Sequence, residues 1–174
     1  QYYITVAKEF RRGLKKIENN LCTPYKYKKH PKKIKGPCLV EYKYDGVRVI
    51  GITKNNSTTL YSRNGKILSN FPHIEEALSK KEFNDLVFDG EVMSDDFQSL
   101  MKQVHRKEGA QTEDAFLALF DVLPLSEFNE GKSTLDSLER KEVLNLLSKK
   151  FSDCIRPVDF TIIDFDTEAG EKTF

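Results

Sequence analysis

The sequence has 174 residues, of which 39% are hydrophobic and 32% are charged. This composition predicts one globular domain with an extension, and no apolar run is long enough to span a bilayer. The first residues lack the layout of a secretory signal, so we expect an intracellular protein. The three cysteines and three histidines are scattered, and they indicate neither a disulfide framework nor a zinc site.

The net charge of +1 hides a strong asymmetry along the chain. Residues 1–37 contain 11 lysines and arginines against 2 acidic residues, whereas residues 38–174 contain 17 against 25. Helical spacing over residues 4–20, followed by a proline-interrupted stretch at 21–37, predicts a basic N-terminal helix and linker. Such charge suits binding to phosphates without sequence preference, and it suits a solvated linker equally well.

The folded domain is expected over residues 38–174 and opens with a predicted antiparallel meander. Its strands and turns are predicted at residues 39–44, 45–46 (turn), 47–54, 55–57 (turn) and 58–63. The later elements are predicted as a helix at 72–82, a strand at 86–93, a helix at 97–104 capped by 94–96, a strand at 115–122, a helix at 136–150, a strand at 154–163 and the opening of a helix at 166–174. Because this order lacks a regular βαβ repeat, the sequence predicts an α+β fold of antiparallel sheets with packed helices.

One short segment contains residue types that suit phosphate chemistry. Alternation along the first strand puts Glu41 and Lys43 on one face, and the turn after them brings Arg48 back on the next strand. An acid, a lysine and an arginine suit a phosphate-handling pocket, but they also suit a surface ion-pair cluster. The pattern alone leaves both interpretations open.

Residues 43–48 match the KxDGxR signature of the covalent nucleotidyltransferases, which comprise DNA ligases, RNA ligases and mRNA-capping enzymes. Three later segments resemble further motifs of that family in the same order: the SRxG element at 62–65, the DGE strand at 89–91 and the FDxL strand at 120–123. The residues around the lysine, and the Leu-Glu-Arg sequence at 138–140, look like those of ATP-dependent DNA ligases. The resemblance covers about residues 38–174 and implies the adenylation (nucleotidyltransferase) domain of such a ligase.

This resemblance implies that Lys43 attacks the α-phosphate of ATP, expels pyrophosphate and holds AMP through a phosphoramidate. Glu41 would contact the adenine amino group, and Phe120 would stack on the adenine ring. Periodicity by itself predicts instead that Phe120 is an ordinary core residue.

The resemblance also implies how the remaining charged residues act. Glu91 would approach the ribose hydroxyl or hold Mg²⁺, which prefers carboxylates together with substrate phosphates. Because Glu91 interrupts an apolar strand, its carboxylate needs a partner in any case. Arg48 and Arg63 would bind AMP or the 5′-phosphate of a nick, since a guanidinium fork suits phosphate oxygens. Asp45 would position the turn after the lysine.

The family's later motifs, a second glutamate strand and a strand with two lysines, are not found before Phe174. We therefore expect a C-terminally truncated adenylation domain with weak or no activity of its own, from a parent enzyme that seals nicks in duplex DNA with ATP and Mg²⁺. An RNA ligase or an mRNA-capping guanylyltransferase is the enzymatic alternative, and a non-catalytic nucleic-acid-binding module is the other. No amphipathic stripe is left over for a protein partner, so we expect a monomer.

Overall fold

The computed structural model describes residues 2–6, 36–95, 101 and 114–167. In chain order its elements are β1 (Tyr2–Val6), β2 (Pro37–Tyr42), β3 (Val47–Lys54), β4 (Ser57–Ser62), α1 (Pro72–Leu78), a 3₁₀ helix (Lys81–Phe83), β5 (Leu86–Met93), β6 (Phe116–Pro124), α3 (Leu125–Glu130), α4 (Ser137–Ser148), β7 (Ile155–Pro157) and β8 (Phe160–Asp164). Within these ranges, no helix has the length and apolar character needed to cross a membrane.

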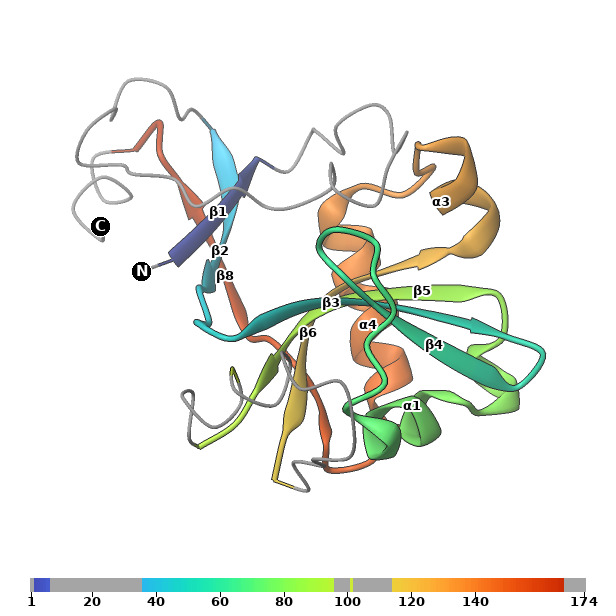
Figure 1. Ribbon diagram of the computed structural model, residues 1–174. Helices are drawn as coiled ribbons and strands as arrows, with labels where there is room; N and C mark the ends of the chain where they lie inside the picture. Colours follow the sequence, from blue (N-terminus) through green and yellow to red (C-terminus); the bar gives the residue numbers. More distant parts are fainter. Residues whose placement is uncertain (1, 7–35, 96–100, 102–113, 168–174) are drawn as a thin grey trace.

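The strands form two sheets, which lie beside each other in Figure 1. The smaller sheet has the order β1-β2-β8 and the larger one the order β4-β3-β5-β6-β7. All neighbouring strands are antiparallel except β6 and β7, which are parallel because the chain returns between them through α4. The predicted α+β class is confirmed, with this parallel pair as the exception to the predicted antiparallel pairing.

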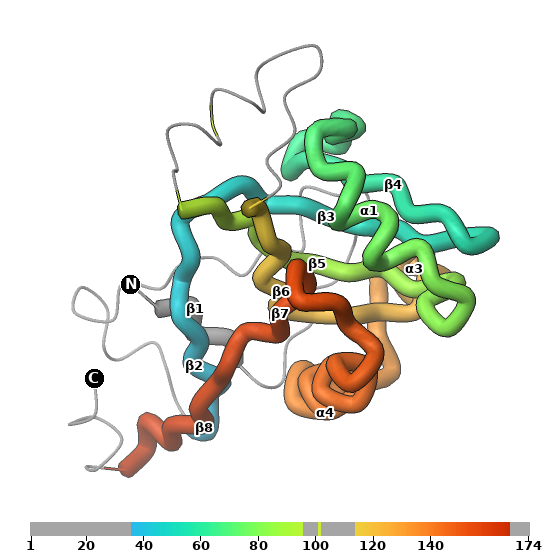
Figure 2. The backbone as a smooth tube through the Cα atoms, turned by 90° about the horizontal axis from the view of Figure 1, so that it is seen from below, coloured from blue at the N-terminus to red at the C-terminus, as the bar shows by residue number. Residues whose placement is uncertain are grey.

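Within the described residues the chain crosses from one sheet to the other at two places, which Figure 2 shows along the tube. Residues 43–46 lead from β2 into β3, and residues 158–159 lead from β7 into β8. The prediction of one continuous strand over 154–163 is therefore wrong. Pro157 has no N–H to donate to a strand ladder, and β7 ends at this residue.

The main apolar core lies on one face of the larger sheet. Phe88 and Val92 of β5 are fully buried there and pack with Ile74 and Leu78 of α1. Leu144 of α4 belongs to the same cluster. Helix α1 follows the predicted start at Pro72 but ends at Leu78, and only the short 3₁₀ helix continues toward the predicted end at residue 82.

Two local predictions are confirmed by backbone geometry. Asn55 and Asn56 both have positive φ, at 52° and 57°, as a tight two-residue hairpin turn between β3 and β4 requires. Helix α4 begins after Asp136, whose side chain accepts from the backbone N–H of Glu139 at 2.9 Å. The Glu139 carboxylate accepts from the Asp136 N–H at 2.7 Å, which completes a capping box.

The N-terminal prediction is wrong where the structure describes it. Residues 4–6 belong to β1, which pairs with β2 at Ile4↔Val40, and not to a helix. The run of tyrosines and β-branched residues at 2–6 favours a strand, and this preference prevails over the helical spacing. Residues 7–35 of the predicted helix and linker lie outside the described residues. The same is true of most of the helix predicted at 97–104 and of residues 168–174.

Candidate active site

Lys43 lies in the segment that connects the two sheets, three residues before Gly46, which is packed against β5. The backbone N–H of Gly46 donates to Oε1 of Glu91 at 2.8 Å. A Cβ on residue 46 would lie 2.2 Å from the carbonyl oxygen of Val92. This position needs glycine for the close approach of two backbones. The lysine-bearing segment is thereby held beside Glu91.

Glu91 is a buried carboxylate, with 7% of its surface exposed. Burial raises its pKa, whereas the Gly46 N–H and the positive charges of Arg48 and Lys43 lower it. The sequence predicted that a carboxylate in this apolar strand would need a partner, and the Gly46 N–H is that partner. Glu91 and Lys43 are therefore close enough for their charges to interact.

Arg48 forms a bidentate ion pair with Asp89 on the neighbouring strand. Its Nε and Nη2 atoms donate to the two carboxylate oxygens, each at 2.6 Å. The guanidinium carbon also lies 5.1 Å from the centroid of the Phe120 ring. Burial raises the pKa of Asp89, and the charge of Arg48 opposes that shift. The pair fixes Arg48 between Glu91, its cross-strand neighbour, and Phe120.

A β-bulge determines which way Phe120 faces. In the β5–β6 ladder Asp89 pairs with Asp121 and Gly90 with Leu119, so Phe120 is the extra residue of the bulge. Its ring is 3% exposed and lies 6.4 Å from the ring of Tyr44, in the segment that carries the lysine. Phe120 is buried, as periodicity predicts, but in a small cluster outside the main core. We call the sheet face with Arg48, Asp89, Glu91, Phe120 and Asp121 the site face.

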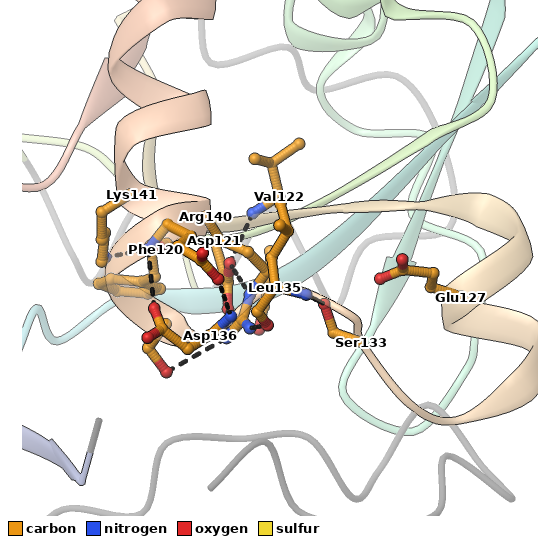
Figure 3. Close-up of polar contacts among 12 residues, drawn as sticks. Phe120, Asp121, Val122, Glu127, Ser133, Leu135, Asp136, Arg140 and Lys141 are labelled. Carbon is orange, nitrogen blue, oxygen red and sulfur yellow. Dashed lines mark hydrogen bonds and ion pairs between the residues drawn. The ribbon is translucent and has the colours of Figure 1, made fainter. Parts of the chain in front are cut away.

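Glu41 comes from the smaller sheet and is 3% exposed. Its carboxylate forms an ion pair with the ammonium of Lys141 on α4, and the same ammonium donates to the carbonyl oxygen of Phe120. Burial raises the pKa of Glu41, and the Lys141 charge opposes this shift. Lys141 therefore connects residues of both sheets, and Figure 3 shows it beside Phe120.

Arg140 precedes Lys141 and is also buried, at 1% exposure. Its guanidinium donates to both oxygens of Asp121, at 2.9 and 3.1 Å, and to the carbonyl oxygen of Leu135 at 2.7 Å (Figure 3). Neither of these two cations is among the site residues predicted from the sequence. A signal was available: in α4 they occupy two of the buried positions Ser137, Arg140, Lys141 and Leu144, the spacing of a core-facing stripe.

The structure brings most of the predicted site residues together. Glu41, Arg48, Glu91 and Phe120 surround the lysine segment, whereas Arg63 is exposed in the turn after β4. The pairing of Ser62 with Val49 places Arg63 at the same end of the sheet as Arg48, but not buried with it. Asp45 is also exposed.

The Glu91 carboxylate is suited to bind a metal ion that substrate oxygens also coordinate. Within the described residues no group of three or more histidines, cysteines or acids could hold a metal by itself. Mg²⁺ does not need such a group, because it usually binds one or two carboxylates together with substrate phosphates and water. One buried carboxylate beside a lysine fits that pattern.

The fold is that of the covalent nucleotidyltransferases. The family profile described as "ATP dependent DNA ligase domain" matches residues 20–169. The chain belongs to the ATP-dependent DNA ligase domain family. A curated DNA ligase from Methanospirillum hungatei is 29% identical over 126 residues, which cover 66% of this chain and 23% of that protein. The chain thus spans less than a quarter of this relative.

Solved structures agree with the family assignment. The structure titled "Pmar-Lig_Pre." is 41% identical, with a TM-score of 0.78, over 85% of this chain and 36% of that one. The ATP-dependent DNA ligase from bacteriophage T7, in complex with ATP, shares the fold with a TM-score of 0.53 at 20% identity, over 79% of this chain and 52% of that one. The predicted adenylation-domain fold is confirmed by these matches.

Proposed function

We propose that this chain carries the nucleotide-accepting site of an ATP-dependent DNA ligase that acts as a monomer on nicked duplex DNA. The observation that carries the proposal is the contact between Gly46 and Glu91. It joins the signature lysine segment to the DGE strand at 2.8 Å, from positions 45 residues apart in the sequence. Two motifs of the family thus meet around the amine that would react.

The proposed first step is a nucleotidyl transfer to Lys43. Its amine, after losing a proton, attacks the α-phosphorus of ATP, a P–N bond forms, and the P–O bond to pyrophosphate breaks with the electron pair leaving on pyrophosphate. In the second step the 5′-phosphate of the nick displaces the lysine and takes the AMP. In the third step the 3′-hydroxyl attacks that phosphate, which seals the strand and releases AMP.

The surrounding residues would bind and orient the nucleotide. Glu41 would accept from the adenine amino group, and the Phe120 ring would contact the adenine face. Arg48 and Arg63 would contact phosphate oxygens of AMP or of the nick. Glu91 would hold Mg²⁺, which neutralises phosphate charge when it is bound.

The test is covalent labelling with ATP that carries the label on its α-phosphate. The chain and the full-length product of its gene are incubated with this ATP and Mg²⁺, separated under denaturing conditions and treated with acid. We expect an acid-labile label on the full-length protein that is absent from Lys43→Ala. Lys54→Ala, which removes an exposed lysine at the far end of β3, is the matched control and should label normally.

The same assay separates the alternatives. Label from GTP instead of ATP would indicate a capping guanylyltransferase, and sealing of nicked RNA but not nicked DNA would indicate an RNA ligase. A full-length protein that takes no label from either nucleotide would contradict the proposal and support a binding module.

A further inference from the structure

Lys141 connects the two groups that would contact the adenine ring from different sheets. Its ammonium binds the carboxylate of Glu41 in the smaller sheet and the carbonyl oxygen of Phe120 in the larger sheet. The Lys141 side chain is 5% exposed and that of Glu41 is 2% exposed. One cation on α4 therefore sets the relative positions of both groups.

The charge of Lys141 also favours the ionised form of Glu41 over the protonated form that burial favours. A buried carboxylate without a partner takes up a proton, because the charged form loses its hydration. The other charged groups that act on Glu41 are Arg48 on β3, which favours its ionised form, and Asp121 on β6, which opposes it. Lys141 is the charge in direct contact with the carboxylate.

An ionised carboxylate distinguishes adenine from guanine. It can only accept hydrogen bonds, whereas a protonated carboxyl group can also donate one. Adenine presents an amino group where guanine presents a carbonyl oxygen. A carboxylate therefore accepts from adenine and repels guanine, and a neutral group at the same place loses much of that preference.

We propose that Lys141 is a positioning residue that keeps Glu41 charged and aligned with Phe120, and that it thereby selects ATP over GTP. This inference rests on the proposed function, because it takes Glu41 and Phe120 as the residues that contact the base. Lys141 itself does not touch the nucleotide in this arrangement. Its effect is expected on nucleotide choice and affinity, and less on the rate once ATP is bound.

The experiment compares Lys141→Met with Lys149→Met in the full-length protein. Methionine keeps most of the apolar length of lysine and removes its charge, and Lys149 is an exposed residue at the end of the same helix. Dissociation constants for ATP and for GTP are measured by equilibrium dialysis with EDTA present, and the labelling rate is measured at saturating ATP with Mg²⁺. Thermal unfolding monitored by circular dichroism shows whether each variant is folded.

We expect Lys141→Met to weaken ATP binding by about ten- to a hundredfold, as for a lost hydrogen bond to a charged group. GTP binding should change much less, so the ratio of the two constants falls, while the labelling rate at saturation changes little. Lys149→Met should match the wild type. A folded Lys141→Met protein that keeps the wild-type preference for ATP would overturn the inference and leave Lys141 a structural residue.

A second variant covers the case in which Lys141→Met does not fold. Lys141→Gln removes the charge and keeps a neutral N–H donor on a polar side chain that is one bond shorter. A reduced preference for ATP in this variant supports the inference, and an unchanged preference overturns it. Failure of the proposed function itself is distinguishable, because the wild-type protein would then take no label.

Discussion

The two faces of the five-stranded sheet are built from alternate residues of the same strands, yet their interactions differ. On one face, Phe88 and Val92 of β5 lie in the apolar core beneath α1. On the site face, Asp89 and Glu91 of the same strand are buried carboxylates with polar partners. Burial of apolar surface stabilises the first face. On the second, the cost of removing charges from water offsets much of the attraction between them. The site face therefore fixes the positions of its charged side chains and contributes less than the apolar face to the free energy of folding.

The largest effect on stability is expected from the apolar face. Phe88 is fully buried, and its ring lies 5.6 Å from that of Phe83 and 6.3 Å from that of Phe151. Phe88→Ala should lower the free energy of unfolding by about 3 to 5 kcal/mol, because it removes apolar contacts and leaves a cavity. Urea denaturation measures this loss. Ile67→Ala, at a side chain that is 66% exposed, should change it by less than about 0.5 kcal/mol. Equal losses in the two variants would contradict this account of the core.

A smaller but still large effect is expected when an ion pair of the site face is broken. Asp121→Asn leaves the Arg140 guanidinium, 1% exposed, without its negative partner. The free energy of unfolding should fall by about 3 kcal/mol, because the buried guanidinium then loses the carboxylate counter-charge of Asp121. The control is Glu130→Gln, which breaks the exposed pair with Lys132 at 3.3 Å and should cost less than about 1 kcal/mol. Similar losses from both substitutions would mean that burial does not determine how much each ion pair contributes to the free energy of unfolding.

The smallest effect is a change in the pH dependence of stability at Glu91. Its pKa is raised in the folded protein, so the folded state binds this proton more tightly than the unfolded state. Stability from this group is present below the ordinary pKa of 4.5 and is lost as the pH rises through the folded-state pKa. Glu91→Gln removes that loss. The variant should gain stability relative to the wild type across this interval, by about 1.4 kcal/mol for each pH unit between the two pKa values. Denaturation at several pH values measures it, and a difference that is constant with pH would contradict it.

Regular alternation made part of the fold predictable from the sequence. The predicted strands at 47–54 and 86–93 match β3 and β5 residue for residue. In β6 the predicted strand is present, but the bulge at Phe120 changes which residues share a face, and a period-2 pattern gives no sign of it. At 154–163 the apolar and β-branched residues favour a strand, but Pro157 ends β7, and the partners of the two halves show that they belong to different sheets.

The candidate site was predictable to the extent that family signatures mark it. Glu41, Glu91 and Phe120 were found from those signatures and lie around the lysine segment. Lys141 was not found, because charged residues on a helix are expected in water unless they are paired. Its partner Glu41 is 100 residues earlier in the chain, so the buried pair exists only through the tertiary fold.

The two crossings between the sheets limit how the active site can move. A chain that passed between the sheets once would allow one sheet to rotate about that single connection. Here the second connection, residues 158–159, follows β7 directly, and the Val158 N–H donates to the Leu119 carbonyl oxygen at 2.8 Å, next to Phe120. The chain between the two crossings therefore leaves the small sheet and returns to it. Lys43 lies in the first crossing, and Leu119, the neighbour of Phe120, contacts the second. Any rotation of the small sheet must bend both connections, so the distance between Lys43 and the Phe120 ring is constrained from two sides.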